Sequence, residues 1–512
     1  MRCATSPATP CYRGAVQQAH TGLAWLLLGL MAFGCGRIGF GVGGDGGPDA
    51  RLPDGATPGS DAATDAPVEL CNGLDDDGDT LVDEDFDLTT DPSNCGRCGN
   101  ACAFPNASAR CTAGACALRA CLAGWGNCNA DDTDGCETGV SSDVANCGRC
   151  ARACPIGATC GEGICSSDVA QLAAGGDFTC GRIQAGAVYC WGGNSAGQLG
   201  DGTNTDSVRP VATLVTSSTV VAAGTAHACA ADGSGVLCWG SNSAGQLGDG
   251  TTTDSSAPVR ALVSGTAGVT AVAAGRAHSC AVLGDGTVSC WGANAAGQLG
   301  DGTMNDLLGP VQVVGISGAT GVAAGDSHTC AAVGEGAIVC WGSNSDGQLG
   351  NGTTTDSPVP VMTGLLFEPN IDVGAFHSCA DDEGYCWGRN SEGQLGDGSL
   401  TTRTSPVAFL APGPVGLAVG DAHSCVLTST QTVFCAGRNA DGQLGDGTTT
   451  NSPTPVMVPA LTQITDVSAG RAHTCAVNRF GVMRCWGANE SGQLGDGTRT
   501  GRLTAVRVAA LP

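Results

Sequence analysis

Residues 273–303 read AAGRAHSCAVLGDGTVSCWGANAAGQLGDGT, and residues 323–353 read AAGDSHTCAAVGEGAIVCWGSNSDGQLGNGT. A period of about fifty residues indicates a repeat architecture, in which each unit buries its apolar face against the next unit. Within the first stretch, HSCAVL and TVSCWG flank the glycine-rich segment Gly284–Gly286. Two short β-branched and apolar runs around such a segment predict a strand, a tight turn and a second strand.

The two cysteines of each unit are predicted to form a disulfide across this hairpin. If Leu283 pairs with Thr287, Cys280 lies directly opposite Cys290. In a non-hydrogen-bonded antiparallel pair the Cα atoms lie about 4.5 Å apart, a distance that a disulfide tolerates. Seven units therefore predict seven bridges: Cys180 to Cys190, Cys229 to Cys238, Cys280 to Cys290, Cys330 to Cys340, Cys379 to Cys386, Cys425 to Cys435, and Cys475 to Cys485.

Other residues recur in these units at fixed positions. An Asn and the motif GQLG occur in all seven units, and a Trp follows the second Cys in all but one, which has Ala436. Recurrence in every unit indicates architecture, because a catalytic site needs a few different residues that converge once. We therefore expect no enzymatic activity.

A His stands two residues before the first Cys of six units, and Phe178 takes its place in the first unit. Two interpretations are open: a metal site built by ring symmetry, or buried and hydrogen-bonded structural histidines. We favour the structural role, because nothing in the sequence compensates for Phe178.

The pattern GxxHxC, then CWGxNxxGQLGxGT, then a Pro-Val strand, resembles the regulator of chromosome condensation repeat. The resemblance covers residues 169–512 and implies an all-β fold, a seven-bladed β-propeller of about 50 residues per blade with four strands in each. We also expect the tail strand Leu503–Leu511 to complete the blade begun by the first unit and so to close the ring.

The N-terminal part predicts export. Residues 1–34 are a predicted signal peptide, because the apolar run Leu23–Phe33 is shorter than the about 20 residues that span a bilayer. The segment AFGC resembles a bacterial lipoprotein signal and predicts a lipid on Cys35; cleavage without lipidation is the alternative. Residues 35–70, rich in Gly, Asp, Pro and Ala, are a predicted disordered linker. With 31 cysteines in the chain, these features predict an outer-membrane lipoprotein facing outside or the periplasm, or a secreted protein.

Residues 71–168 form a predicted disulfide-rich, loop-rich module with 14 cysteines, in which NCGRCGNAC (94–102) returns as NCGRCARAC (146–154). Seven further bridges are expected, with a connectivity that the sequence leaves open. Zinc is the alternative for the C-x-x-C-x-x-x-C spacing, but the module contains no His. The module resembles Cys-flanked acidic segments on exported proteins of myxobacterium-like bacteria, which implies surface display.

An acidic loop opens this module. Asp75, Asp77, Asp79 and Asp83 occupy positions 1, 3, 5 and 9 of a calcium-binding loop, where alternate carboxylates converge on one cation. Position 6 is Thr80 instead of Gly, and position 12 is Phe86 instead of Glu. A Ca²⁺ site and a solvated acidic loop are both consistent with this segment, and no other cofactor is expected.

The formal net charge of −26 disfavours nucleic acid as a partner. The family resemblance implies either regulation of a small GTPase by nucleotide exchange, as in intracellular members, or protein binding, as in secreted bacterial propellers. We favour a monomeric, rigid scaffold that binds a protein or glycan at the cell surface and meets the membrane only through its lipid. Nucleotide exchange is the alternative, and a sialidase-like glycosidase is less favoured. Variable residues at a fixed repeat position mark the expected binding rim: Arg276, Asp326, Asp421 and Arg471.

Overall fold

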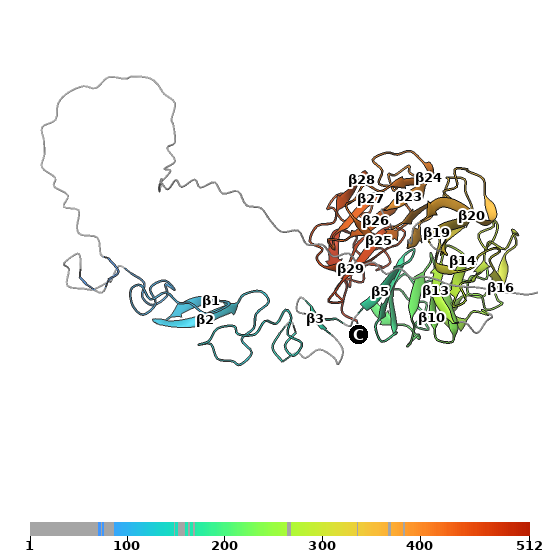
Figure 1. The fold of residues 1–512 in the computed structure, drawn as a ribbon. Coiled ribbons are helices and arrows are strands. Elements are labelled where there is room, and N and C mark those ends of the chain that lie inside the picture. The colour runs from blue at the N-terminus through green and yellow to red at the C-terminus, as the bar shows by residue number, and fades with distance from the viewer. Residues whose placement is uncertain are drawn as a thin grey trace, which may run out of the picture. The chain divides into compact units, whose positions relative to one another are not determined.

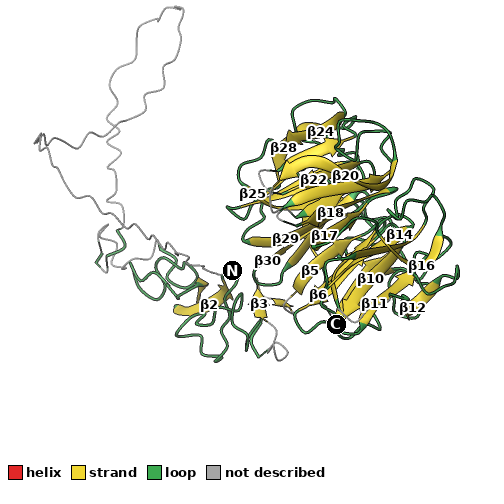
Figure 2. Cartoon of the chain, turned by 45° about the vertical axis from the view of Figure 1, so that its right-hand side comes forward, coloured by secondary structure: helices red, strands yellow, loops and turns green. Residues whose placement is uncertain are grey.

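The computed structural model describes residues 70–72, 74–75, 86–147, 149–151, 159–161, 164–166, 169–263, 268–334, 336–366, 370–381 and 384–511. The expected signal peptide, Cys35 and all of the linker except Leu70 lie outside these ranges, as do Asp77, Asp79 and Asp83. The described residues form strands and loops (Figure 2), and none of them forms a helix long and apolar enough to cross a membrane.

Seven four-stranded antiparallel sheets make up residues 169–511, which confirms the predicted seven-bladed propeller (Figure 1). The strands of each blade follow chain order, so each blade is one continuous segment. The first strands face the central channel: β5 (Val169–Ala174), β9 (Val220–Ala223), β13 (Val269–Ala274), β17 (Ala319–Ala324), β21 (Ile371–Val373), β25 (Pro414–Val419) and β29 (Ile464–Ala469). The second strands begin at the repeated His or at Phe178: β6 (Phe178–Ile183), β10 (His227–Asp232), β14 (His278–Leu283), β18 (His328–Val333), β22 (His377–Ala380), β26 (His423–Thr428) and β30 (His473–Asn478).

The remaining two strands complete each blade toward its outer edge. The third strands carry the second Cys: β7 (Val188–Gly192), β11 (Gly235–Gly240), β15 (Val288–Gly292), β19 (Ala337–Gly342), β23 (Tyr385–Gly388), β27 (Val433–Gly437) and β31 (Met483–Gly487). The outer strands are β8 (Ser207–Ala212), β12 (Ser255–Arg260), β16 (Leu307–Gln312), β20 (Ser357–Leu366), β24 (Arg403–Ala408), β28 (Ser452–Met457) and β32 (Arg502–Arg507).

Each blade carries one disulfide between its second and third strands. In the third blade Cys280 lies opposite Cys290 in the strand register, as the turn between Leu283 and Thr287 requires. The structure forms all seven bridges of the repeats, with Cα–Cα distances of 4.0–4.1 Å. All fourteen cysteines are fully buried.

The expectation for the tail strand is wrong. Strand β32 pairs with β31 in the last blade, whereas β5 to β8 supply all four strands of the first blade. Because every unit brings its own outer strand, no blade lacks a strand that the tail could replace. Side chains close the ring where β29 lies beside β5 (Figure 1). The backbone N–H of Leu172 donates to the Asp466 carboxylate at 2.9 Å, and that of Ala174 donates to the Ser468 hydroxyl at 2.9 Å.

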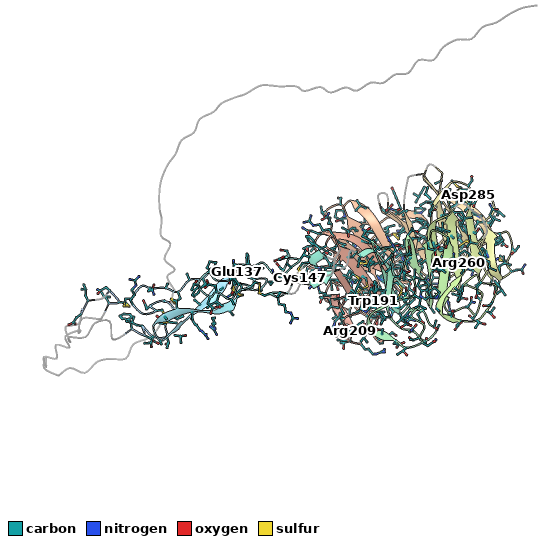
Figure 3. The ribbon with its side chains drawn as sticks, turned by 90° about the horizontal axis from the view of Figure 1, so that it is seen from below. Glu137, Cys147, Trp191, Arg209, Arg260 and Asp285 are labelled. Atoms are coloured by element: carbon teal, nitrogen blue, oxygen red, sulfur yellow. A yellow bond between two sulfur atoms is a disulfide. The ribbon has the colours of Figure 1, made fainter. Side chains whose placement is uncertain are left out.

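The recurring Trp and GQLG residues join neighbouring blades. Trp291 Nε1 donates a hydrogen bond to the Gln246 carbonyl of the preceding blade at 2.8 Å. The other five tryptophans make the same bond at 2.9 Å, including Trp191, which lies inside the propeller (Figure 3) and bonds Gln493 of the last blade. All six tryptophans are fully buried. The blades are therefore held by apolar packing around a repeated, satisfied indole N–H.

The cysteine-rich module contains two hairpins, β1 (Ala107–Thr112) with β2 (Ala115–Cys121), and β3 (Thr159–Gly161) with β4 (Ile164–Ser166). Six bridges lie within its described part: Cys71–Cys98, Cys95–Cys111, Cys102–Cys116, Cys121–Cys136, Cys128–Cys150 and Cys147–Cys160. Cys154 and the side chain of Cys165 lie outside the described residues.

The connectivity repeats with the sequence of the module. In NCGRCGNAC and in NCGRCARAC, the first Cys bonds a downstream hairpin and the second Cys bonds an upstream residue. The sulfurs of Cys95, Cys102 and Cys116 lie within 4.8 Å of one another. Each of them belongs to a disulfide, so none is a thiolate that could bind zinc.

Candidate functional site

The inner strands of the seven blades enclose a central channel with a volume of about 480 Å³. Most of these strands end in two small residues and are followed by a glycine, as Ala273 and Ala274 are followed by Gly275. Glycine is required here, because a Cβ on Gly275 would overlap the carbonyl oxygen of Gly325 in the next blade. Small side chains therefore let seven strands converge while the channel stays open.

One residue per blade, directly after this glycine, surrounds one mouth of the channel. We call this set the mouth ring; in chain order it consists of Gly176, Thr225, Arg276, Asp326, Ala375, Asp421 and Arg471. The four residues of the expected binding rim are thus all members of it, and the structure brings them together around one opening. Blades one, two and five contribute the small members.

The two arginines of the mouth ring already have acidic partners. Arg276 Nη1 lies 3.6 Å from Asp326 Oδ2 of the next blade, and Arg471 Nη2 lies 2.6 Å from Asp177 Oδ1 of the first blade. Within the described part of the chain, the Asp421 carboxylate has no hydrogen-bond or ion-pair partner. Burial raises the pKa of Asp421 to about 6, and the nearby Asp326 adds to this shift. Asp421 is therefore the acid in the mouth that is best placed to receive an external positive group.

Two further aspartates face the channel, and the sequence analysis missed them. Asp372 on β21 accepts the backbone N–H of Val419 at 2.8 Å, and Asp466 on β29 accepts that of Leu172 at 2.9 Å. Burial raises the pKa of Asp372 to about 7 and that of Asp466 to about 6. Alignment of the repeats gives a signal for Asp372, which stands where the other inner strands have Ala or Ser. It gives none for Asp466, because that position also holds Gln171, Val220 and Asn370 in other blades.

Carboxylates therefore gather on one side of the channel. Asp326, Asp372, Asp421 and Asp466 come from four consecutive blades, the fourth to the seventh, whereas the first three blades contribute mainly Ala, Gly and Val. This lining can bind charged groups through carboxylates, guanidinium groups and backbone amides.

The repeated histidines do not form a metal site. Each Nε2 lies 2.8–2.9 Å from the hydroxyl of a Ser or Thr in the next blade. Among the described residues, the three bridged cysteines above are the one group of potential ligands that converges. The Phe178 exception is in fact compensated: the residue that it faces in the second blade is Ala228, where the other blades have Ser or Thr.

Of the expected calcium ligands, Asp75 lies in the described residues and is exposed. Its three companions lie outside them, so the Ca²⁺ site stays a prediction.

Comparison with known families decides the relationship of the chain. The model of the regulator of chromosome condensation (RCC1) repeat matches residues 185–231, 234–282, 285–332, 335–380, 381–427 and 432–477, which together cover more than half of the chain. The chain belongs to the RCC1 repeat family. A second model of the same repeat matches residues 169–198, 269–298, 319–348, 415–443 and 464–493 of this RCC1-repeat chain. The six family repeats are out of phase with the blades, because 185–231 spans the last two strands of one blade and the first two of the next.

Solved structures share the RCC1 fold. The structure of Kap60 bound to yeast RCC1 (Prp20) matches at 25% identity and a TM-score of 0.58, over 64% of this chain and 84% of the other. Human WBSCR16 matches at 22% identity and a TM-score of 0.58, over 64% of this chain and 94% of the other. Prp20p from Saccharomyces cerevisiae, in a study of its binding to Gsp1p and histones, matches at 24% identity and a TM-score of 0.54, over 65% of this chain and 86% of the other. The RCC1-repeat chain thus has the same propeller, with a disulfide in every blade.

Proposed function

We propose that this protein is an exported, lipid-anchored binding protein whose propeller receives a protein or glycan partner at the mouth ring. The observation that carries the proposal is the convergence of Arg276, Asp326, Asp421 and Arg471 around one opening of the channel. Rigid scaffolds with variable loop residues at one face are suited to binding. The scaffold already holds the loops in place, so little conformational entropy is lost when a partner binds.

The disulfides support the exported location. Seven bridges in the propeller and six in the described part of the module require an oxidising compartment during folding. The leader sequence and Cys35 agree with this location.

Charge reversal at the mouth tests the binding role. The full-length protein and the double variant Arg276→Glu, Asp421→Arg would each be used to capture partners from the extracytoplasmic fraction of the source cells. Arg260→Glu serves as the matched control, because Arg260 is an exposed residue of an outer strand with a single acidic partner at 3.3 Å. We expect partners that bind the wild type and the control but bind the mouth variant about tenfold less, roughly 1.4 kcal/mol. If the mouth variant captures the same partners in the same amounts as the wild type, the proposal is refuted.

The anchor is tested separately by the mass of the N-terminal peptide. A diacylated Cys35 supports the lipid anchor, and an unmodified N-terminus after cleavage shows secretion without it.

A second candidate is regulation of a small GTPase, which the 25% identity to yeast RCC1 (Prp20) favours. This role requires the chain to fold in the reducing cytosol. Peptide mapping without reductant separates the two candidates: seven closed propeller bridges support the exported scaffold, and free thiols in the native protein support the GTPase regulator.

A further inference from the structure

A hydrogen-bond relay crosses the interface between neighbouring blades. His278 Nε2 lies 2.9 Å from the Thr329 hydroxyl of the next blade, and that hydroxyl donates to the Gln298 carbonyl at 2.8 Å. Trp341 Nε1 donates to the same carbonyl. Because the single hydroxyl proton is used toward Gln298, the hydroxyl must accept from the His, so Nε2 carries the imidazole proton.

Four other interfaces repeat this relay, through His227 and Ser279, His328 and Ser378, His423 and Thr474, and His473 and Thr179. In a sixth, His377 Nε2 lies 2.8 Å from the Ser424 hydroxyl. The neutral imidazole is therefore the form that the interfaces hold.

The second ring nitrogen determines the response to acid. All six Nδ1 atoms are buried and have no hydrogen-bond partner, and all six histidines are fully buried. A proton can be added only at Nδ1, where it would place a positive charge without an acceptor. Burial accordingly lowers the pKa of His227, His328, His377 and His473 to about 3, and that of His278 and His423 to about 4.

The charged groups near these histidines act in the same direction. The positive charges of Arg389, Arg438 and Arg471 lower the pKa values of His377, His423 and His473, respectively. Neighbouring histidines also lower the pKa values of His227, His328, His377 and His473. No carboxylate among the described residues contributes to these shifts.

The interface between the first and second blades lacks the relay. Phe178 and Ala228 replace the His and the hydroxyl there and pack in one apolar cluster. Among the described residues, this interface therefore lacks the imidazole that the relay supplies at the other interfaces.

We propose that the ring is an acid-sensitive closure: protonation of the interface histidines separates the blades, while each disulfide-bonded blade persists and the first and second blades stay together. A histidine released from its interface regains its ordinary affinity for protons, so opening takes up protons as the pH falls below 6.5. The channel aspartates Asp326, Asp372, Asp421 and Asp466 oppose this, because their raised pKa values favour the closed ring in acid. The pKa values of the six histidines fall from 6.5 to about 3 or 4, which together exceeds the rise of three aspartates from 3.8 to about 6 or 7 and the smaller rise of Asp326, so the net effect of acid is opening.

Tryptophan fluorescence of the full chain under oxidising conditions tests the proposal. All six interface tryptophans are fully buried and bonded to the preceding blade. Separation therefore exposes five of them and shifts their emission to longer wavelength, while Trp239, which packs with Phe178 between the first and second blades, stays buried. Far-UV circular dichroism of the same sample reports whether the strands persist. We expect the emission to shift between pH 6 and pH 4 at about constant strand signal.

The matched variant copies the natural exception. His278→Phe with Thr329→Ala should lower the midpoint pH, and it should reduce by about one the number of protons taken up, which is given by the pH dependence of the opening constant. If that variant does not fold, His278→Gln, which keeps a donor toward Thr329, should give the same loss of one proton. Asp372→Asn should act in the opposite direction and increase the proton uptake.

Three results would overturn the proposal. These are unchanged midpoint and proton uptake in the His278 variants, simultaneous loss of the strand signal and the buried emission, and a closed ring down to pH 4.

Discussion

At the interface between the fifth and sixth blades, a phenylalanine fills the space that a tryptophan fills elsewhere. Ala436 stands at the Trp position of β27, and Gly396, whose counterparts face a Trp, faces the Phe409 ring. Phe409 is 3% exposed and packs with Ala436 and Leu395 in one cluster. It occupies the position of Val313 and Val458 in other blades. Two substitutions on different blades therefore conserve the volume of one interface.

The Phe409 and Ala436 pair gives a testable prediction. Ala436→Trp alone should destabilise the propeller by about 1–3 kcal/mol, because the indole has no space beside Phe409. Phe409→Val alone should cost about 2 kcal/mol through the cavity that it leaves. The double variant should recover most of this loss, and chemical denaturation measures the coupling. Strict additivity of the two changes would contradict this account.

Sequence reasoning at the residue scale reached the contacts within one hairpin and missed those between blades. The Cys280 to Cys290 bridge could be predicted, because a tight turn fixes which residues of a hairpin are opposite. The pairing of Phe178 with Ala228 could not, since it depends on how two separate sheets pack. Phe178 looked uncompensated for that reason alone.

At the scale of the element, the loop that ends in GQLG places its last glycine against the neighbouring blade. A Cβ on Gly300 would lie 2.7 Å from Trp341 Nε1, whereas a Cβ on Gly302 would meet its nearest atom at 3.9 Å. Both glycines have positive φ, 70° and 84°. Replacement by alanine therefore costs a similar backbone strain at both positions, but only at Gly300 does the added Cβ clash with a neighbouring side chain.

Gly300→Ala should consequently be much more destabilising than Gly302→Ala. The backbone strain of about 1 kcal/mol is common to both variants, and the clash with Trp341 should add about 1–3 kcal/mol to Gly300→Ala alone. Thermal unfolding of the two variants measures the difference. Equal losses would show that the indole moves aside without cost.

The repeats predicted the hairpins of each blade, but they left the assignment of the outer strand open. A periodic sequence can be divided at any point of its period, and the family repeats are indeed out of phase with the blades. Residues on neighbouring strands, such as Cys485 of β31 and Val506 of β32, settle the assignment because they are hydrogen-bonded neighbours in the sheet. The expectation for the tail strand was wrong because it assigned that strand to the first blade instead of the last.

At the scale of the whole molecule, the ring closes through side chains and packing between the last and the first blade. Deletion of residues 502–512 should therefore expose the edge of β31 and remove Val508 from its cluster with Trp191, while the hydrogen bonds of Leu172 and Ala174 to the last blade remain. Hydrogen exchange should become faster in Met483–Gly487 and stay slow in Val188–Gly192. Faster exchange in the first blade instead would show that the tail supports the first blade.

The residues of the site also differ in whether the sequence of one repeat is enough to place them. The mouth ring could be predicted in part, because Arg276 and Asp326 vary at a position where the scaffold around them is constant. Alignment of the repeats marks Asp372 as unusual, but neither Asp372 nor Asp466 could be placed at the channel, since the inward direction of an inner-strand side chain is defined only once seven blades surround a channel.

The burial of all fourteen propeller cysteines has a consequence for the biogenesis of the protein. An oxidising enzyme needs physical access to a thiol, and the closed ring gives none. Each bridge must therefore form while its hairpin is still free. Ring closure is then the last step, and it assembles units that are already cross-linked. The oxidant has to act before closure, since an oxidant that arrives later finds no accessible thiol.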